Sequence, residues 1–312
     1  MQFDWSPKTL KEWRDFYSRA KTANWMQNWA YAQASFKNDY LMSKLGLIIH
    51  DGKAVGMMCV QMIRLGPIEV INLKRGPLWF VEPTSQLLIE FAKAFREEFP
   101  KKALQRLRWM PELSPEITEN DEIAKTITKL GFKLKKEFFL TSWIDLTLPV
   151  DVLRKNLDQK WRNCLNKAEK QNLKLVTQTS LKDFEVFLNY YELYKRKKRF
   201  LGPSSKFLRT EFNELNMTDD FVLLWAQQEH QPIAGVAIVF QGTTAAYRVG
   251  WNTHEGRKSN AHYLLLWQAL QVAKLRGATK FDVGGLLPDE APGVTHFKSG
   301  LKGQVTLCLT FA

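Results

Sequence analysis

Two stretches with the same internal order decide the fold class of this chain. Residues 45–65 read LGLIIHDGKAVGMMCVQMIRL, and residues 221–241 read FVLLWAQQEHQPIAGVAIVFQ. In each stretch two apolar runs flank a short polar turn, and Asp51-Gly52 in the first turn is a strong hairpin signal. We therefore expect an antiparallel β-hairpin in each half of the chain.

The segments around the two hairpins also follow a common order. In the first half we expect helices at 9–20, 84–99 and 121–130 and strands at 69–73, 104–109 and 138–146. In the second half we expect helices at 182–199 and 261–276 and strands at 245–249, 280–283 and 304–311. Strands interleaved with helices after a hairpin indicate an α/β fold with mixed sheets. The sequence thus predicts two tandem α/β domains, residues 1–147 and residues 148–312.

Composition limits the classes of protein that this chain can belong to. Its 312 residues are 45% hydrophobic, which is typical of a well-cored globular protein. No run approaches the ~20 apolar residues that span a bilayer, and the N-terminus lacks a signal-peptide layout. The three cysteines are far apart, so we expect no disulfide framework, no zinc site and a cytoplasmic location. A net charge of +13 favours an anionic partner: nucleic acid, an acidic lipid surface or a phosphorylated substrate.

Two further segments carry candidate functional residues. Residues 160–176 read KWRNCLNKAEKQNLKLV, with Lys160 and Arg162 beside an apolar helical face; a solvated charged face would give the same pattern. Residues 293–303 read GVTHFKSGLKG and follow an irregular stretch after FDVGG at 281–285. We expect Lys298 in a loop bordered by glycines, where it either faces solvent or serves chemistry.

These segments resemble motifs of the Fem family of non-ribosomal aminoacyltransferases (FemABX). The matching pieces are KWRNCLNKA at 160–168, Arg199-Phe200, IAGVAIVFQGTTAAYRVGWN at 233–252, FDVGG, GVTHFKSGLKG, and, more loosely, 26–31 and 74–77. Members of this family add amino acids from aminoacyl-tRNA to peptidoglycan precursors. The resemblance implies two tandem domains of the GCN5-related N-acetyltransferase (GNAT) fold, with no room for the coiled-coil arm of some members.

The resemblance also implies roles for individual residues. Lys298 would offset the negative charge of the transition state, with Phe297 assisting through its main chain. Phosphate contacts would come from Lys160, Arg162 and Arg199, and the substrate-lining strand would contribute Tyr247 and Arg248. The acceptor site of the first domain would be shaped by Gln27, Trp29, Tyr31 and Arg75. Ser35 stands where some members have a lysine.

Two other functions compete with this interpretation. An acyl-CoA-dependent N-acyltransferase would place small residues in the turn before the long helix, where main-chain N–H groups bind pyrophosphate. Here Asn260 and His262 stand in that turn, which favours tRNA over CoA as donor. A non-catalytic protein that binds RNA or a membrane surface is the second alternative.

The expected cofactor set is empty, because aminoacyl-tRNA would act as a co-substrate. The expected acceptor is a UDP-linked or lipid-linked muropeptide. A lipid-linked acceptor would add peripheral contact with the inner face of the plasma membrane.

Overall fold

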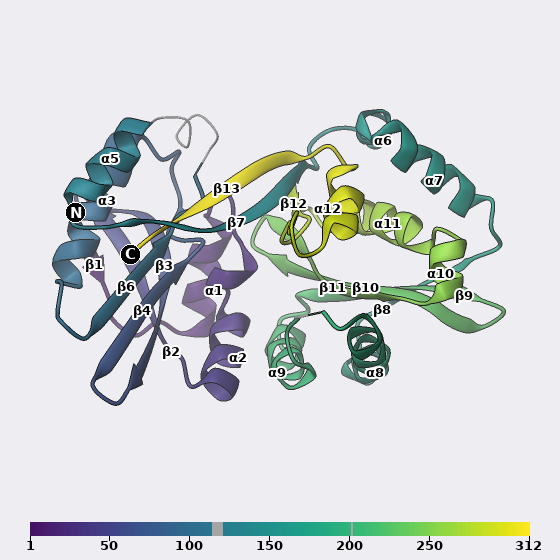
Figure 1. The fold of residues 1–312 in the computed structure, drawn as a ribbon, viewed down its shortest axis with the longest axis horizontal. Coiled ribbons are helices and arrows are strands. Elements are labelled where there is room, and N and C mark those ends of the chain that lie inside the picture. Colours follow the sequence, from purple (N-terminus) through teal and green to yellow (C-terminus); the bar gives the residue numbers. More distant parts are fainter. Residues whose placement is uncertain (114–120, 201) are drawn as a thin grey trace. The chain divides into compact units, whose positions relative to one another are not determined.

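The computed structural model describes residues 1–113, 121–200 and 202–312, which form two compact units (Figure 1). Unit 1 comprises Met1–Thr141 and Val305–Ala312, and unit 2 comprises Ser142–Gln304. The sequence predicts a boundary after residue 147 and places the last strand in the second domain. In the structure Val305–Ala312 belongs to unit 1, because Phe311 pairs with Trp109 and lies in the core of that unit.

The sheet of unit 1 contains the first predicted hairpin. Its strands follow the order β1 (Gln2–Asp4), β2 (Met42–His50), β3 (Lys53–Leu65), β4 (Ile68–Lys74), β6 (Gln105–Met110), β13 (Gln304–Phe311) and the first part of β7 (Leu134–Asp145). The short β5 (Leu78–Trp79) pairs with β3. Strands β2 and β3 are antiparallel across Asp51-Gly52, whereas β4 and β6 are parallel, so the sheet is mixed.

Helices cover both faces of this sheet. Helices α1 (Leu10–Ser18) and α2 (Trp29–Asp39) pack over a core cluster that includes Trp13, Met57 and Cys59. Helices α3 (Ser85–Glu98) and α5 (Asp121–Lys129) pack over a second cluster built around Phe91 and Trp109.

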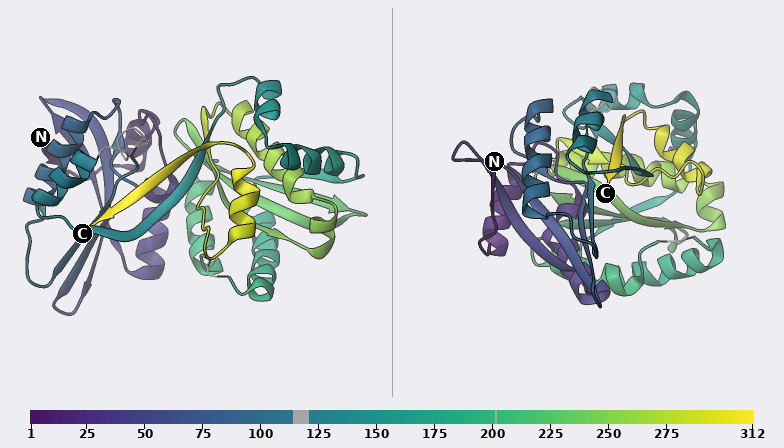
Figure 2. Two further views of the ribbon diagram at one scale, coloured as in Figure 1. Left: turned by 45° about the horizontal axis from the view of Figure 1, so that its top comes forward. Right: turned by 60° about the vertical axis from the view of Figure 1, so that its left-hand side comes forward.

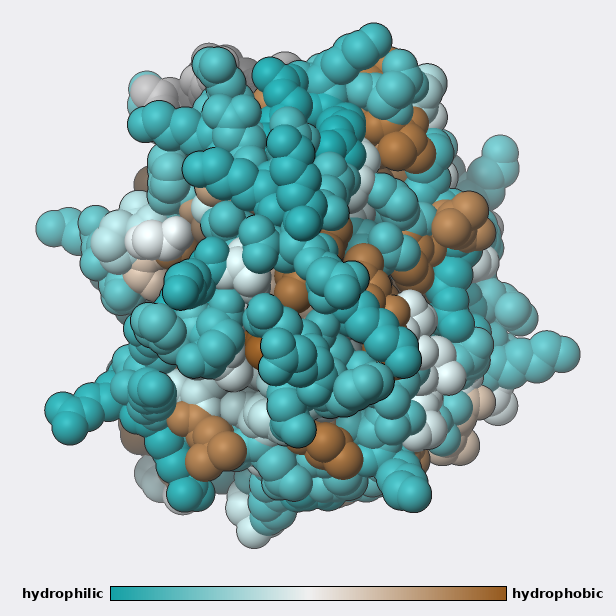
Figure 3. Space-filling model, turned by 90° about the vertical axis from the view of Figure 1, so that its right-hand side faces the viewer, coloured by the Kyte–Doolittle hydropathy of each residue, from teal (hydrophilic) through white to brown (hydrophobic). Residues whose placement is uncertain are grey.

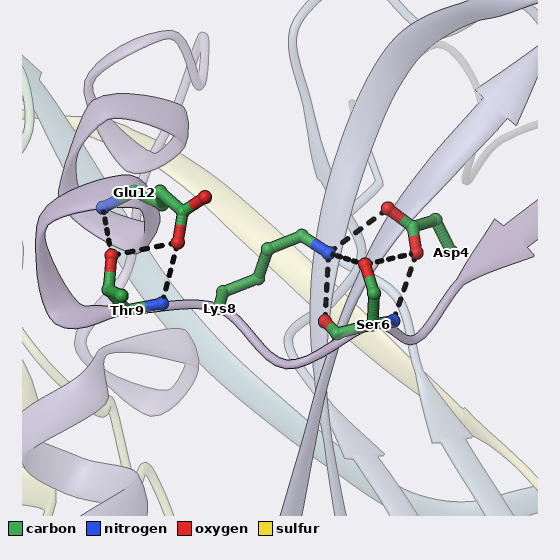
Figure 4. Close-up of polar contacts among 5 residues, drawn as sticks. All are labelled: Asp4, Ser6, Lys8, Thr9 and Glu12. Atoms are coloured by element: carbon green, nitrogen blue, oxygen red, sulfur yellow. Dashed lines mark hydrogen bonds and ion pairs between the residues drawn. The ribbon is translucent and has the colours of Figure 1, made fainter.

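Polar contacts fix the start of α1, as Figure 4 shows. The Thr9 hydroxyl accepts from the Glu12 amide, and the Glu12 carboxylate accepts from the Thr9 amide, which together form a capping box. Lys8 Nζ donates to Asp4 and Ser6, so the segment between β1 and α1 is held to the end of β1 (Figure 4).

The sheet of unit 2 repeats this plan. Its strands follow the order β7, β12 (Lys280–Asp282), β11 (Thr244–Asn252), β10 (Gln231–Gln241), β9 (Phe221–Gln228) and β8 (Lys174–Gln178). Strands β11 and β12 pair in parallel, whereas the other described strand pairs of this unit are antiparallel, so this sheet is mixed as well.

The helices of unit 2 lie on both faces of its sheet (Figures 1 and 2). One face carries α8 (Leu181–Lys198) and α9 (Ser205–Asn216). The other carries α6 (Val150–Asn156), α7 (Gln159–Glu169), α10 (His254–Lys258), α11 (Ala261–Leu275) and α12 (Pro292–Ser299).

The expected loop around Lys298 is wrong, because Pro292–Ser299 forms helix α12. Pro292 stands in the first turn of this helix, where proline is favoured since its fixed φ suits the helix and its missing N–H is not needed. Lys298 is therefore held by a helix rather than by a flexible segment.

The surface of unit 2 in Figure 3 is mostly hydrophilic, with small scattered hydrophobic areas. Among the helices of the described residues, none combines the length and the apolar character needed to cross a bilayer.

Candidate functional site

The ammonium group of Lys298 lies inside unit 2. The residue is only 7% exposed, and its Nζ donates a hydrogen bond of 2.9 Å to the main-chain oxygen of Gly285. The same Nζ lies 5.1 Å from the ring centroid of Tyr247, within range of a cation–π interaction. Burial lowers the pKa of Lys298 from 10.5 to about 8, while the nearby Asp282 carboxylate opposes that shift. The site therefore contains a desolvated lysine that is still charged near neutral pH.

The geometry of the segment after β12 explains why position 284 is a glycine. Gly284 has a φ of +73°, a region that favours glycine, and a Cβ there would lie 3.0 Å from the main-chain oxygen of Tyr247. That Cβ would also lie 3.4 Å from Lys298 Nζ. Asp282 is buried, and its Oδ1 accepts from the Gly284 amide at 2.8 Å. These contacts are those of a structural residue at a strand end.

Trp161 joins α7 to the Lys298 helix. Its Nε1 donates to the main-chain oxygen of Phe297 at 3.0 Å, and its ring lies 6.1 Å from the Phe297 ring in a stacked arrangement. Tyr263 completes the group, with ring centroids 5.1 Å from Trp161 and 4.9 Å from Phe297. The Phe297 main chain is thus used to hold α12 in place.

Sequence reasoning missed Trp161, although the signal was present. It lies between Lys160 and Arg162 and continues the apolar helical face of Leu157 and Leu165.

His262 is a further titratable side chain near Lys298. Its ring centroid lies 5.9 Å from that of Phe297 and 6.5 Å from that of Tyr247. Its Nδ1 is buried and has no hydrogen-bond partner within the part of the chain that the structure describes. Burial, reinforced by the Lys298 charge, lowers the pKa of His262 from 6.5 to about 4. The imidazole is therefore neutral at pH 7.

The two predicted residues of β11 have different surroundings. The side chain of Tyr247 lies under Lys298, and burial raises the pKa of its hydroxyl. Arg248 forms an ion pair with Glu211 of α9, with Nη2 and Oε2 2.9 Å apart and both side chains at most 5% exposed. The structure thus brings Tyr247 to Lys298 and holds Arg248 against α9.

The three predicted phosphate-binding cations lie elsewhere on unit 2. Lys160 is exposed in the first turn of α7, and Arg162 donates to the main-chain oxygen of Lys155 at 2.9 Å. Arg199 is exposed at the end of α8, with a φ of +51°. Within the described part of the chain, none of these three side chains forms a hydrogen bond or ion pair with Lys298.

In unit 1 the side chains of two predicted acceptor residues form hydrogen bonds or an ion pair within the protein. The Gln27 side chain donates to the main-chain oxygens of Lys74 and Cys59 and accepts from the Cys59 amide, at 2.7, 3.2 and 2.7 Å. Arg75 is fully buried and pairs with Glu112 at 2.9 Å. Their contacts are those of structural residues.

The other two predicted acceptor residues lie on α2. Trp29 begins α2 and packs against the α1/α2 core, and Tyr31 lies 5.1 Å from the Trp25 ring. Lys74 Nζ lies 5.9 Å from the Tyr31 ring centroid, so Tyr31 and Lys74 form a half-exposed aromatic and basic pair.

Comparisons with known proteins agree with this architecture. Residues 153–299 match the family model of an acetyltransferase (GNAT) domain. No curated protein sequence matches the chain. The crystal structure of FemX superposes with a TM-score of 0.79 at 15% identity and covers 100% of this chain and 96% of that one.

Two more distant structures share the fold. The C-terminal domain of a putative lysylphosphatidylglycerol synthetase from Agrobacterium fabrum gives a TM-score of 0.58 at 11% identity, covering 97% of this chain and 90% of that one. A tandem GNAT protein from the clavulanic acid biosynthesis pathway gives 0.53 at 13% identity, covering 100% and 98%.

These matches confirm the fold that the sequence predicts. The GNAT match covers the segment that contains Trp161, His262 and Lys298, and it supports an acyltransferase. The chain therefore consists of two tandem GNAT-like units with mixed sheets and has the fold of FemX.

Proposed function

We propose that this protein is an aminoacyltransferase that moves an amino acid from aminoacyl-tRNA to an amine of a peptidoglycan precursor stem peptide. The observation that carries the proposal is the burial of the Lys298 ammonium beside Gly285 at the end of β12. The resemblance of residues 293–303 to the Fem motif supports the choice of donor.

The chemistry of the transfer explains why a buried lysine would help. The acceptor amine attacks the ester carbonyl of aminoacyl-tRNA, so that a C–N bond forms and negative charge gathers on the carbonyl oxygen. The C–O bond to the tRNA ribose then breaks, and the ribose oxygen takes up the proton that the amine releases. A fixed positive charge in a partly dry site stabilises the oxyanion more than it stabilises the neutral ester. We assign this role to Lys298.

Phe297 and Trp161 act as positioning residues in this proposal. The hydrogen bond from Trp161 Nε1 to the Phe297 main chain fixes the helix that presents Lys298. The ring of Tyr247 would stabilise the ammonium of Lys298 by a cation–π interaction. The ion pair of Arg248 with Glu211 would hold α9 against β11.

The remaining predicted residues would serve the substrates. Lys160, Arg162 and Arg199 would contact phosphates of the tRNA or of the nucleotide-linked precursor. Trp29 and Tyr31 would contact the acceptor in unit 1, whereas Gln27 and Arg75 would act only by shaping the surrounding main chain.

An acyl-CoA-dependent N-acyltransferase is the second candidate, because the matching family model is that of an acetyltransferase domain. Acyl-CoA binding requires open main-chain N–H groups at the start of the long helix. In this chain α11 begins after Asn260, and the His262 side chain of its first turn lies against Phe297 and Tyr247. Asn260 and His262 also replace the two small residues that acyl-CoA users place in this turn, which favours the tRNA donor.

Transfer of labelled amino acids from a pool of charged tRNAs to UDP-linked or lipid-linked muropeptide tests the proposal, with acetyl-CoA as a parallel donor. We expect label from one charged tRNA and none from acetyl-CoA. Label from acetyl-CoA alone would contradict the proposed donor. The matched variants are Lys298→Ala and Lys302→Ala, since Lys302 lies four residues away with a side chain that is 58% exposed.

A further inference from the structure

The β3–β4 hairpin of unit 1 ends in exposed aliphatic side chains. Leu65 and Ile68 are directly opposite each other across the Gly66-Pro67 turn, and they are 58% and 41% exposed. Residues directly opposite in a sheet project from the same face. Figure 1 shows this hairpin at one end of unit 1.

A third aliphatic residue extends this pair across the next strand. Strands β4 and β6 are parallel with Glu69 opposite Gln105, and the Glu69 amide donates to the Leu104 main-chain oxygen at 3.0 Å. Extending the register by one residue places Leu104, which is 51% exposed, beside Ile68. Leu65, Ile68 and Leu104 therefore form one row at the end of the sheet, which we call the aliphatic row.

Cations surround the aliphatic row. Residues 61–70 and 100–110 contain five basic residues and one acidic residue. All five basic residues are exposed, and four of them lie within three residues of a member of the row in sequence, namely Arg64, Lys101, Lys102 and Arg106. The single carboxylate, Glu69, is held by Gln105 and Arg64, which lower its pKa. The end of the sheet thus presents apolar side chains within a field of unbalanced positive charge.

We propose that this end of unit 1 is a docking surface for an anionic membrane. Aliphatic side chains can enter the boundary between headgroups and acyl chains, while the surrounding cations attract anionic headgroups. Single-stranded nucleic acid, the other anionic polymer, is bound by cations together with stacking aromatic rings. The aliphatic row offers no such ring, so the combination fits a lipid surface better. This inference does not depend on which donor the protein uses.

Vesicle co-sedimentation of the full chain tests the proposal. The vesicles are pure phosphatidylcholine or phosphatidylcholine with one third phosphatidylglycerol. We expect wild-type protein to partition on the order of tenfold more strongly onto the anionic vesicles at low salt.

Three variants locate the contact. Leu65→Ser with Ile68→Ser removes two members of the row and should lower binding on the order of tenfold. Lys101→Gln with Lys102→Gln should lower binding by a similar factor at low salt and by much less at high salt. Leu275→Ser is the matched control, because Leu275 is 86% exposed beside Arg276 in unit 2, and it should bind like wild type.

Hydrogen exchange gives an independent readout of position. Amides of residues 64–69 and 101–105 should exchange more slowly when anionic vesicles are present. Wild-type binding that does not prefer anionic vesicles would overturn the proposal, and so would unchanged binding by the Leu65/Ile68 variant. Loss of tRNA binding in that variant, with vesicle binding intact, would overturn it in favour of a nucleic-acid surface.

Discussion

Two buried cations, Arg75 in unit 1 and Lys298 in unit 2, differ in how their charge is compensated. In unit 1 the guanidinium of Arg75 is paired with Glu112, and the buried side chain of Gln27 is bound by main-chain groups of β3 and β4. In unit 2 the buried ammonium of Lys298 has a main-chain oxygen and an aromatic ring beside it and, among the described residues, no carboxylate in ion-pair contact.

This difference separates structural from functional candidates. Burying a charge costs free energy unless a partner offsets the lost hydration. The ion pair with Glu112 offsets the lost hydration of Arg75. The partners of Lys298 offset less of its lost hydration, as its lowered pKa indicates. Lys298, a buried cation without an ion-pair partner among the described residues, is therefore a better candidate for a catalytic role than Arg75.

Arg75→Ala tests the structural side of this comparison and should have the largest effect. The change leaves Glu112, whose side chain is 13% exposed, without the guanidinium partner. Breaking a buried ion pair costs about 3–5 kcal/mol of unfolding free energy, which urea denaturation measures. Arg64→Ala is the control, since Arg64 is 74% exposed in its pair with Glu69 and should cost less than about 1 kcal/mol. Similar losses of unfolding free energy for the two variants would show that the buried pair of Arg75 contributes no more than the exposed pair of Arg64.

The pH dependence of stability tests the environment of His262. The pKa of its imidazole is 6.5 when unfolded and about 4 when folded, so the unfolded chain binds the proton first as the pH falls. Stability should therefore be complete above pH 6.5 and decrease toward pH 4, by on the order of 2 kcal/mol for this group. The side chain of His262→Gln cannot titrate. In urea denaturation at pH 7 and pH 4.5, the unfolding free energy of this variant should therefore decrease less between the two pH values than that of the wild type. Equal pH dependence in both proteins would contradict the assigned burial.

Gly284→Ala should have a smaller effect on stability and a separate effect on turnover. A positive φ disfavours alanine by roughly 1–2 kcal/mol, and the φ of Gly284 is +73°. Gly277→Ala is the control, because its φ is +83° and a Cβ there meets no atom within 4 Å. Gly277→Ala should lose only this amount, whereas Gly284→Ala should lose somewhat more, because its Cβ would lie 3.0 Å from the Tyr247 main-chain oxygen. Only Gly284→Ala, which also crowds Lys298, should slow transfer. Slowing by both would mean that local strain alone affects turnover.

Trp161→Phe should give the smallest change in stability. It keeps an aromatic ring against Phe297 and Tyr263 and removes the hydrogen bond from Nε1 to the Phe297 main chain. A net loss of about 1 kcal/mol is expected in urea denaturation. A lower kcat with an unchanged KM would identify Trp161 as a positioning residue, whereas an unchanged kcat would show that α12 does not need this contact.

Local patterns in the sequence predict much of this fold. The hairpin at Asp51-Gly52 and the long helix at 261–276 follow from turn chemistry and apolar periodicity, and the structure confirms both. Helix α9 was missed although Ser204 caps it and Leu208, Phe212 and Leu215 follow at helical spacing. The return of the last strand to unit 1 depends on long-range pairing with β6, which no local pattern encodes.

The site was predictable only in part. The family resemblance picked out Lys298 and Tyr247, which the structure places together. It also picked out Gln27, Arg75 and Arg248, whose side chains the fold uses for its own hydrogen bonds and ion pairs. Whether a polar side chain is already satisfied depends on tertiary contacts, so residue type and spacing could not separate the two groups.

The most direct test of the account is a paired measurement on Lys298→Ala, with Lys302→Ala as the control. Transfer from charged tRNA is measured under single-turnover conditions, and the free energy of unfolding is measured in urea. The account predicts that the barrier to transfer rises by about 2–4 kcal/mol, while the unfolding free energy hardly changes or increases, because a poorly compensated buried charge is removed. Wild-type transfer by Lys298→Ala would contradict the account, and so would a loss of transfer that is matched by an equal loss of stability.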